Sequence, residues 1–233
     1  MTYGTREEAE QTARYYDAIA ARYDADVDGV ARNVTAREAF CRRVSAIAGP
    51  RGTLLDFGCG TGIDAAWYAA RGHQVIAYDI SRGMVNLLRT RCAAEIAAGV
   101  IAPVDGDLDN LIAMLERTGP VTAVAANFAV LNHFRDLNPL LRLLERYMVR
   151  DGAVIASVLN PFYRRDMKKL WWWRGAATSV WTGSIKVDGA VTTYRHFSRS
   201  LRRMAQPCFT LAVDEVRDGG ASNFVTLVLR KSR

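Results

Sequence analysis

A glycine-rich loop that directly follows a short apolar run is the feature that most constrains how this chain can fold. The run is Leu54-Leu55-Asp56-Phe57 and the loop is Gly58-Cys59-Gly60-Thr61-Gly62, after which a helical pattern begins. In an open α/β sheet, ligands bind at the carboxyl ends of the strands, where glycines let the backbone approach a ligand closely. The loop therefore predicts a nucleotide or nucleoside site. Its G-x-G-x-G spacing, with Ile63 where the dinucleotide fingerprint has its third glycine, argues against NAD.

Short apolar runs and helical patterns alternate on both sides of this loop. Two helices are expected before it, one over residues 6–22 and one capped by Thr35 that ends at Ala48. Beyond them, the pattern predicts strands over 53–57, 74–78, 100–104, 121–126 and 153–158, and helices over 63–70, 82–98, 110–117 and 137–148. Such alternation is typical of a parallel sheet with helices on both faces.

The alternation stops after Asn160. Residues 208–216 and 223–229 have strand-like patterns, and the turn sequence Asp218-Gly219-Gly220 joins them, which predicts an antiparallel hairpin at the sheet edge. We therefore expect an α/β fold with a doubly wound, mostly parallel seven-stranded sheet, a C-terminal antiparallel hairpin and a lid-like insertion. The expected single domain, residues 1–233, comprises N-terminal helices (1–50), a cofactor-binding core (51–159), the lid (160–206) and the hairpin (207–233).

Composition excludes several classes of protein. With 233 residues, half of them apolar and 24% charged, the chain can bury a core and is not of the disordered class. No stretch approaches the roughly 18 apolar residues of a membrane helix, and the early Glu7 and Glu8 do not fit a secretory signal, so we expect a cytoplasmic location. The four cysteines are too widely spaced for a metal or redox pair. We expect reduced, mostly buried thiols and no bound metal.

A basic, tryptophan-rich segment stands out within the lid. The chain has a formal net charge of +7, and residues 160–203 hold ten basic residues, two acidic residues and four of the five tryptophans. This combination suits a small aromatic or anionic acceptor, an RNA surface or an anionic lipid surface. Alternatively, the tryptophans form core under the lid while the arginines are solvated. Because the residues before position 53 leave little room for an RNA-recognition domain, we expect a small-molecule acceptor bound by Tyr163, Trp172 and Arg174.

The glycine loop and its surroundings also point to a family. Residues 56–62, the segment Tyr78-Asp79-Ile80-Ser81-Arg82-Gly83-Met84 and the upstream residues 15–24 together resemble the small-molecule branch of the class I S-adenosylmethionine-dependent methyltransferases. The resemblance extends over residues 15–160. It implies a Rossmann-like fold, S-adenosylmethionine as the cofactor with S-adenosylhomocysteine as its product, and methyl transfer to a small molecule.

The same resemblance implies cofactor-binding roles for individual residues. The glycine loop, with Gly58, Cys59, Gly60 and Gly62, is expected at the methionine part of the cofactor. Further assignments are Asp79 to the ribose, Ile80 and Met84 to the two faces of the adenine, and Asp107 with Leu108 to the adenine amino group, with Asp105 as a competitor for the latter role.

Other residues are assigned around the reacting end of the cofactor. Asn127 would offer its backbone carbonyl to the ammonium group, Phe128 would line the reaction site, and Asp56 would orient the loop or the ammonium group. Tyr23 is expected to contact the cofactor or the acceptor, or else to pack the first helix onto the sheet. Packing is the main expectation for Tyr16, and a structural role for Asp64.

Histidine supplies the candidate bases, because an alcohol or phenol acceptor gains from a group that removes its proton. His133 follows the fourth predicted strand and is expected to act as the base or to orient the acceptor, with capping or packing as the alternative. His196, at the end of the basic segment, is a second candidate, whereas His73 is expected on the solvated surface. The N-P-P-[FY] element of nucleic-acid amino-methyltransferases is matched only in part by Asn160-Pro161-Phe162, which is read as a turn.

These expectations favour O-methylation of a small molecule by a cytoplasmic monomer or homodimer. N-methylation of a small metabolite, RNA methylation and a non-catalytic cofactor-binding protein are the alternatives that the sequence leaves open.

Overall fold

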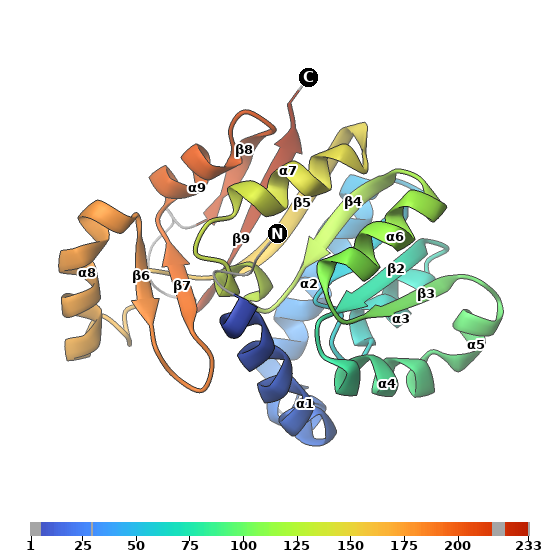
Figure 1. The fold of residues 1–233 in the computed structure, drawn as a ribbon, viewed down its shortest axis with the longest axis horizontal. Coiled ribbons are helices and arrows are strands. Elements are labelled where there is room, and N and C mark those ends of the chain that lie inside the picture. The colour runs from blue at the N-terminus through green and yellow to red at the C-terminus, as the bar shows by residue number, and fades with distance from the viewer. Residues whose placement is uncertain (1–5, 29, 216–221, 233) are drawn as a thin grey trace.

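A seven-stranded sheet organises this computed structural model, which describes residues 6–28, 30–215 and 222–232 (Figure 1). In the order in which they lie side by side, the strands are β3 (Ile101–Asp105), β2 (Gln74–Asp79), β1 (Thr53–Phe57), β4 (Val121–Ala126), β5 (Met148–Leu159), β9 (Phe224–Lys231) and β8 (Phe209–Asp214). The five strands from β1 to β5 pair in parallel, while β9 runs antiparallel to β5 and β8 antiparallel to β9. The predicted fold class is thereby confirmed.

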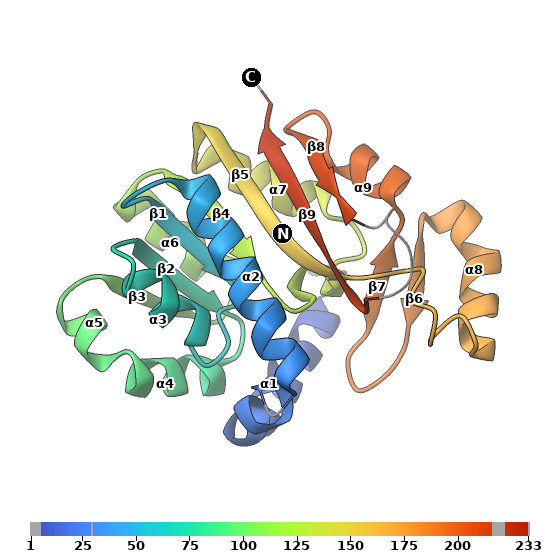
Figure 2. The ribbon, with the colours of Figure 1, turned by 180° about the vertical axis from the view of Figure 1, so that it is seen from behind.

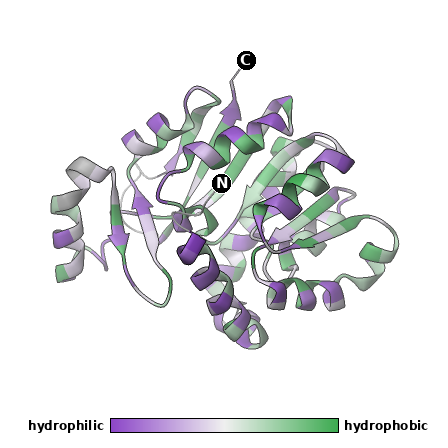
Figure 3. Cartoon of the chain, viewed as in Figure 1, coloured by the Kyte–Doolittle hydropathy of each residue, from purple (hydrophilic) through white to green (hydrophobic). Residues whose placement is uncertain are grey.

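Helices cover both faces of the sheet, as Figures 1 and 2 show from opposite sides. On one face lie α2 (Ala31–Ala48), α3 (Ile63–Ala69) and α4 (Arg82–Arg91), followed by the short α5 (Ala93–Ala97); on the other lie α6 (Leu108–Thr118), α7 (Asn138–Arg146) and α9 (Ser198–Ala205). Successive strand residues point to opposite faces, so Leu54 packs on the face covered by α2, α3 and α4, and Leu55 on the face covered by α6, α7 and α9. Figure 3 shows the resulting pattern, with mainly hydrophobic central strands and hydrophilic turns on the outer helices.

The segment expected to form a lid has structure of its own. After β5 the chain forms α8 (Leu170–Thr182) and a two-stranded antiparallel sheet of β6 (Ser184–Val187) and β7 (Thr193–His196), before α9 returns to the main sheet. This small sheet is attached to α1 (Arg6–Asp28), where the Tyr194 hydroxyl donates to Glu8 Oε1 at 3.1 Å. It is also attached to the 3₁₀ helix η1 (Val130–His133), because Asn132 Nδ2 donates to the Tyr194 carbonyl at 2.7 Å.

Several predicted boundaries differ from those of the structure. α2 begins at Ala31, four residues before Thr35, whose hydroxyl donates to the Ala31 carbonyl inside the helix instead of capping it. The helix expected over 82–98 is divided at Cys92 into α4 and α5. The fifth strand begins at Met148 and so includes residues expected in the loop before it, and the turn expected at 218–220 lies outside the described residues.

His73 is buried, so its predicted solvated position is wrong. Only 1% of it is exposed, since α2 and the backbone before β1 cover it at the start of β2. Its Nε2 lies 2.7 Å from Ser45 Oγ, and its Nδ1 lies 3.2 Å from the Gly52 carbonyl oxygen. The side chain therefore joins α2 to the amino-terminal edge of the sheet.

Cys41, Cys59 and Cys92 are buried and Cys208 is half-buried, and all four are free thiols. Among the described helices, none has both the length and the hydropathy needed to cross a membrane.

Candidate active site

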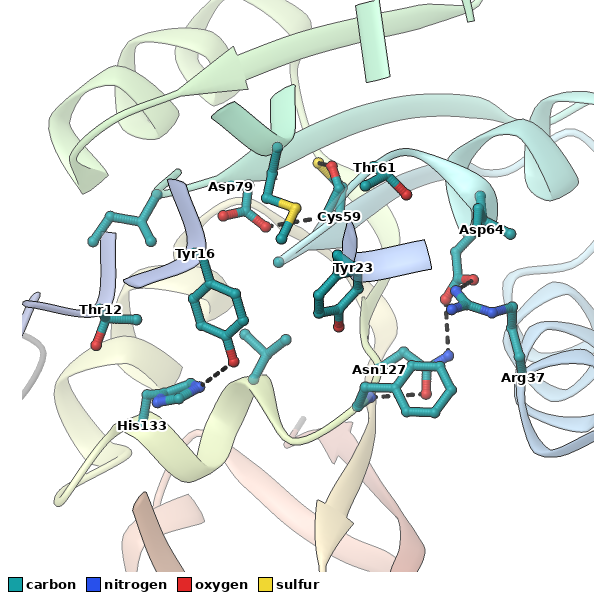
Figure 4. Close-up of a pocket in the computed structure, with 17 residues that line it drawn as sticks. Thr12, Tyr16, Tyr23, Arg37, Cys59, Thr61, Asp64, Asp79, Asn127 and His133 are labelled. Carbon is teal, nitrogen blue, oxygen red and sulfur yellow. Dashed lines mark hydrogen bonds and ion pairs between the residues drawn. The ribbon is translucent and has the colours of Figure 1, made fainter. Parts of the chain in front are cut away.

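A pocket lies at the carboxyl ends of β1, β2 and β4, where the open sheet and the helix α1 meet (Figure 4). Its lining combines the glycine loop, the residues after β2 and β4, and three side chains from α1 (Thr12, Tyr16 and Tyr23). The position agrees with the general location of ligand sites in open parallel sheets.

The glycine loop reaches this pocket through Gly58, Cys59, Gly60 and Thr61. Gly58 has a φ of 80° and donates its N–H to the Tyr78 carbonyl at 2.8 Å, and a Cβ here would lie 2.4 Å from Val130 Cγ2. Gly62 lies outside the lining. A Cβ at Gly62 would lie 2.6 Å from Leu88 Cγ, so this glycine permits the close packing of α3 against α4 rather than contact with a ligand.

Asp79, at the end of β2, points its carboxylate into the pocket. Oδ2 accepts the Gly60 N–H and Oδ1 the Ser81 N–H, both at 2.9 Å. Burial raises the pKa of Asp79 to about 6, although these N–H groups oppose the shift. Ile80 and Met84 line the pocket next to it. The predicted cofactor residues after β2 are thus brought together with the loop.

α1 forms one wall of the pocket and is fastened to it at two acidic residues. Asp17 Oδ1 accepts from the Ser81 hydroxyl at 2.6 Å and from the Gly83 N–H at 2.8 Å. Asp24 accepts from the Thr61 hydroxyl at 2.5 Å and pairs with Arg91. Tyr16 and Tyr23 each directly precede one of these acids, and their ring centroids lie 6.2 Å apart. Both side chains line the pocket, so the expectation of simple packing for Tyr16 was incomplete.

A charged network that the sequence did not reveal forms the opposite wall. Arg37 of α2 pairs with Asp64 of α3 through Nη1 and Oδ1 at 2.5 Å, and Asn127 Nδ2 donates to the other carboxylate oxygen at 2.8 Å. The guanidinium also lies 4.7 Å from the ring centroid of Phe128. Figure 4 shows these side chains converging beside the loop after β4.

The network supports an unusual turn. Phe128 and Ala129 have φ values of 49° and 68°, in the left-handed region that non-glycine residues avoid. Asn127 Oδ1 accepts the Phe128 N–H at 2.9 Å while its amide group is held by Asp64. Asp64, for which only a structural role was expected, therefore lines the pocket and holds the side chain that supports this turn. The one sequence signal for Arg37 is a cation on the otherwise buried stripe of α2 that includes Phe40, Cys41 and Val44.

His133 lies across the pocket from this network and contacts α1. Its Nε2 is 3.2 Å from the Tyr16 hydroxyl oxygen and its Nδ1 is 3.4 Å from the Thr192 carbonyl oxygen. Since a carbonyl only accepts, these contacts favour the tautomer with a proton on Nδ1 and a lone pair on Nε2. Burial lowers the pKa of His133 below its ordinary value of 6.5, so the imidazole is neutral at pH 7. A neutral imidazole can accept a proton.

His196, the second predicted base, lies away from the pocket. It is 3% exposed, and its Nε2 lies 2.9 Å from the Phe134 carbonyl oxygen. Burial lowers the pKa of His196 to about 4. Because β7 packs this side chain under the insertion, the structure does not support His196 as a base.

Three predicted cofactor residues also lie outside the pocket lining. Asp107 is exposed and caps α6, with Oδ1 accepting the Asn110 N–H at 3.2 Å, and Leu108 is buried in the core. Asp56 is 1% exposed within β1, where burial raises its pKa. The competitor Asp105 is engaged in ion pairs with Arg82 and Arg89.

None of the three predicted acceptor contacts lines the pocket. Trp172 is 6% exposed and donates its indole N–H to the Pro161 carbonyl at 2.6 Å, so it is part of the insertion's core. Arg174 is exposed and Tyr163 is half-buried. Helix α8, which carries Trp172 and Arg174, lies at the outer side of the β6–β7 sheet, away from the pocket (Figure 1). The Asn160 side chain accepts the Phe162 N–H at 2.9 Å, as in an ordinary turn.

Comparison with known proteins points to one family. Residues 31–205 match the model of a methyltransferase domain. A demethylmenaquinone methyltransferase of Clavibacter sepedonicus is 34% identical over 87 residues, 36% of this chain and 35% of the relative. The biotin biosynthesis bifunctional protein BioHC of Cellvibrio japonicus (strain Ueda107) is 29% identical over 174 residues, 73% of this chain and 31% of the relative. This chain thus spans about a third of the length of these curated relatives.

A solved structure resembles the whole fold. It is geranyl diphosphate C-methyltransferase from Streptomyces coelicolor A3(2), in complex with Mg²⁺, geranyl diphosphate and S-adenosyl-L-homocysteine. The TM-score is 0.64 with 18% identity, covering 97% of this chain and 98% of that chain. At this level of identity, the likeness concerns the fold.

Proposed function

Because this chain belongs to the class I S-adenosylmethionine-dependent methyltransferases, we propose that it methylates a hydroxyl oxygen of a small-molecule acceptor, with His133 as the base. The observation that carries the proposal is the position of His133 in the pocket, with Nε2 3.2 Å from the Tyr16 hydroxyl and Nδ1 3.4 Å from the Thr192 carbonyl oxygen, an arrangement that favours a lone pair on Nε2. The acceptors in the names of two similar proteins, demethylmenaquinone and geranyl diphosphate, are small molecules. This favours a small acceptor over RNA.

The residues around the glycine loop fit the cofactor of this family. Two ribose hydroxyls need a hydrogen-bond acceptor, and the Asp79 carboxylate is held in place for that role by the Gly60 and Ser81 N–H groups. A Cβ at Gly60 would have only Tyr23 Cε1 near it, at 3.9 Å, so the loop leaves open space beside the carboxylate. When bound, S-adenosylmethionine supplies an electrophilic methyl group on its sulfonium and leaves as S-adenosylhomocysteine.

His133 and Tyr16 would prepare the acceptor. As the acceptor oxygen gains the methyl group, its proton moves to His133 Nε2, which the low pKa keeps unprotonated beforehand. The Thr192 carbonyl fixes the tautomer, and the Tyr16 hydroxyl provides a second polar contact for orientation. Phe128 and Val130 supply apolar surface that helps to exclude water.

The first test is calorimetric titration of the purified protein with S-adenosylmethionine and S-adenosylhomocysteine, with NAD as the control. We expect micromolar binding of both sulfur ligands and none of NAD. A screen of phenols, hydroxy acids and amines then measures S-adenosylhomocysteine formation. Product from hydroxyl compounds supports the proposal, product from amines alone transfers the assignment to nitrogen, and binding without product from any class favours the non-catalytic alternative.

A further inference from the structure

The outward face of α8 exposes large apolar side chains, which an ordinary surface helix buries. Residues 170, 173, 174 and 177 follow one another at helical spacing and are all exposed, whereas Trp172 and Ser179 on the other side are buried. Leu170 is 67% exposed and Trp173 60%, the two highest values among the exposed large apolar residues of the described chain. Adjacent large apolar side chains in water mark an interaction surface.

The three consecutive tryptophans divide between the inside and the outside of the insertion. Trp172 is held inward by its bond to Pro161, and Trp171 lies 5.6 Å from the guanidinium of Arg195. Trp173 points outward, with its indole N–H donating to the Met167 carbonyl at 3.0 Å. This bond places Trp173 beside the turn that precedes α8 and fixes an aromatic ring at the surface.

That turn supplies positive charge. Arg164, Arg165 and Lys168 are exposed, as is Arg174 on the helix, and none of them forms an ion pair with a described residue. The acid of this turn, Asp166, is 6% exposed and pairs with Arg195 at 2.8 Å and Lys169 at 3.0 Å, so it cannot neutralise the outer cations. The α8 surface, defined as Arg164, Arg165, Lys168, Leu170, Trp173 and Arg174, therefore combines two large exposed apolar side chains with four exposed cations.

From this arrangement we infer that the α8 surface docks on anionic lipid membranes, with Leu170 and Trp173 entering the headgroup region and the cations pairing with lipid phosphates. A second copy of this chain is disfavoured, because two such surfaces would bring like charges together. RNA is disfavoured because only Trp173 offers a ring on which a base can stack, whereas both Leu170 and Trp173 can enter a lipid headgroup region. In Figures 1 and 2, α8 lies at the outer end of the molecule, where a flat surface can reach it.

The test is co-sedimentation of the full chain with vesicles of phosphatidylcholine alone or mixed with phosphatidylglycerol. We expect binding to the mixed vesicles that weakens as salt rises, and much weaker binding to phosphatidylcholine alone. One double variant removes the apolar groups (Leu170→Ser with Trp173→Ser), and the other removes two cations (Arg164→Ser with Arg165→Ser). Each should weaken binding to the mixed vesicles by about tenfold or more. Because all four side chains are exposed, circular dichroism should show folded proteins.

Matched controls come from other exposed positions. Val34→Ser with Leu87→Ser removes apolar groups that are 46% and 38% exposed, and Arg117→Ser with Arg150→Ser removes the same charge elsewhere. Both control doubles should bind vesicles as the unsubstituted chain does. The inference is overturned if mixed vesicles fail to bind, if control and α8 doubles weaken binding equally, or if the α8 doubles instead abolish a dimer or binding of a single-stranded RNA.

Discussion

The Nε2 atom of His133 lies 3.2 Å from the phenolic oxygen of Tyr16, although 117 positions separate the two residues in the sequence. Their rings meet edge to face, with centroids 5.8 Å apart. The contact joins η1 to α1 within the pocket lining, so the candidate base is positioned by a helix outside the glycine-loop core.

Replacing His133 by Gln should lower the turnover of methyl transfer by about 10²-fold or more, because the acceptor proton loses its base. The affinity for S-adenosylhomocysteine should stay the same, since the imidazole faces the acceptor side. In the unsubstituted enzyme, turnover should fall below pH 6.5 as His133 becomes protonated. Single-turnover kinetics across pH provides the measurement. An unaltered rate constant for His133→Gln would remove this residue from the mechanism.

Cofactor affinity should depend on pH through Asp79. The ribose contact requires the carboxylate, and the pKa of about 6 in the free protein means that acid converts it to the neutral form. The dissociation constant for S-adenosylhomocysteine should rise by about tenfold between pH 7 and pH 5, as measured by calorimetry. Asp79→Asn should bind more weakly, by about 1 to 3 kcal/mol, and lose this pH dependence. A pH profile that Asp79→Asn leaves intact contradicts the ribose assignment.

The same shift predicts the opposite trend for the stability of the ligand-free protein. The pKa of Asp79 is raised from 3.8 in the reference state to about 6 when folded, so the folded chain holds this proton more tightly than the unfolded chain. The contribution to stability is complete below about pH 3.8 and is lost as the pH rises through about 6. Urea unfolding at pH 5 and pH 7 gives the free energy of unfolding of the ligand-free chain and of Asp79→Asn. The difference between their pH dependences is the contribution of Asp79. Equal pH dependence in the two proteins contradicts the shift.

Two arginines of α2 provide a matched comparison of buried and exposed ion pairs. Arg37 and Asp64 are 14% and 6% exposed, whereas Arg42 and Glu38 are 62% and 50% exposed. Arg37→Ala leaves a buried carboxylate without its cation and should lower the free energy of unfolding by about 3 kcal/mol. Arg42→Ala should change it by about 0.5 kcal/mol or less. Similar losses in urea unfolding would mean that the Arg37 pair is not the support of the pocket wall.

A comparison of substitutions at Gly62 and Gly72 distinguishes the cost of backbone strain from the cost of steric overlap. Their φ values are 87° and 85°, but a Cβ at Gly72 meets nothing within 4 Å, while one at Gly62 meets Leu88. Gly72→Ala should lower the free energy of unfolding by about 1 kcal/mol, from the left-handed backbone alone. Gly62→Ala adds overpacking and should lose about 1 to 3 kcal/mol more. Thermal unfolding of the two variants measures the difference, and equal losses would refute the packing role of Gly62.

The sheet could be predicted from the sequence because its signals are local. The bounds of β1 and β4 agree with the apolar runs, and the glycine loop ends β1 where expected. Local signals failed at two places. Thr35 has the chemistry of a cap, but α2 begins four residues earlier, and the Thr35 hydroxyl donates to the Ala31 carbonyl inside the helix. His73 has a polar neighbourhood in sequence, and tertiary packing alone buries it.

The candidate site could be predicted only on its cofactor side. Asp79 and the glycine loop lie at strand ends, whose positions follow from the order of the elements. Arg37 and Asp64 meet because α2 and α3 share one face of the sheet, and no spacing in the chain records that. His196 and Trp172 have suitable chemistry, but both are buried in the insertion's own core. Composition could not distinguish such an insertion from a lid over the pocket.

Because α1 forms one wall of the pocket, the part of the chain needed for a complete pocket begins before the matched domain. The methyltransferase match starts at residue 31, yet Thr12, Tyr16 and Tyr23 belong to the helix before it. A fragment cut at that boundary would keep every glycine of the loop and both partners of the Asp64 carboxylate. It would lose the hydroxyl that His133 faces and one side of the ligand chamber, so the start of the matched domain model and the start of the intact chamber are different places on this chain.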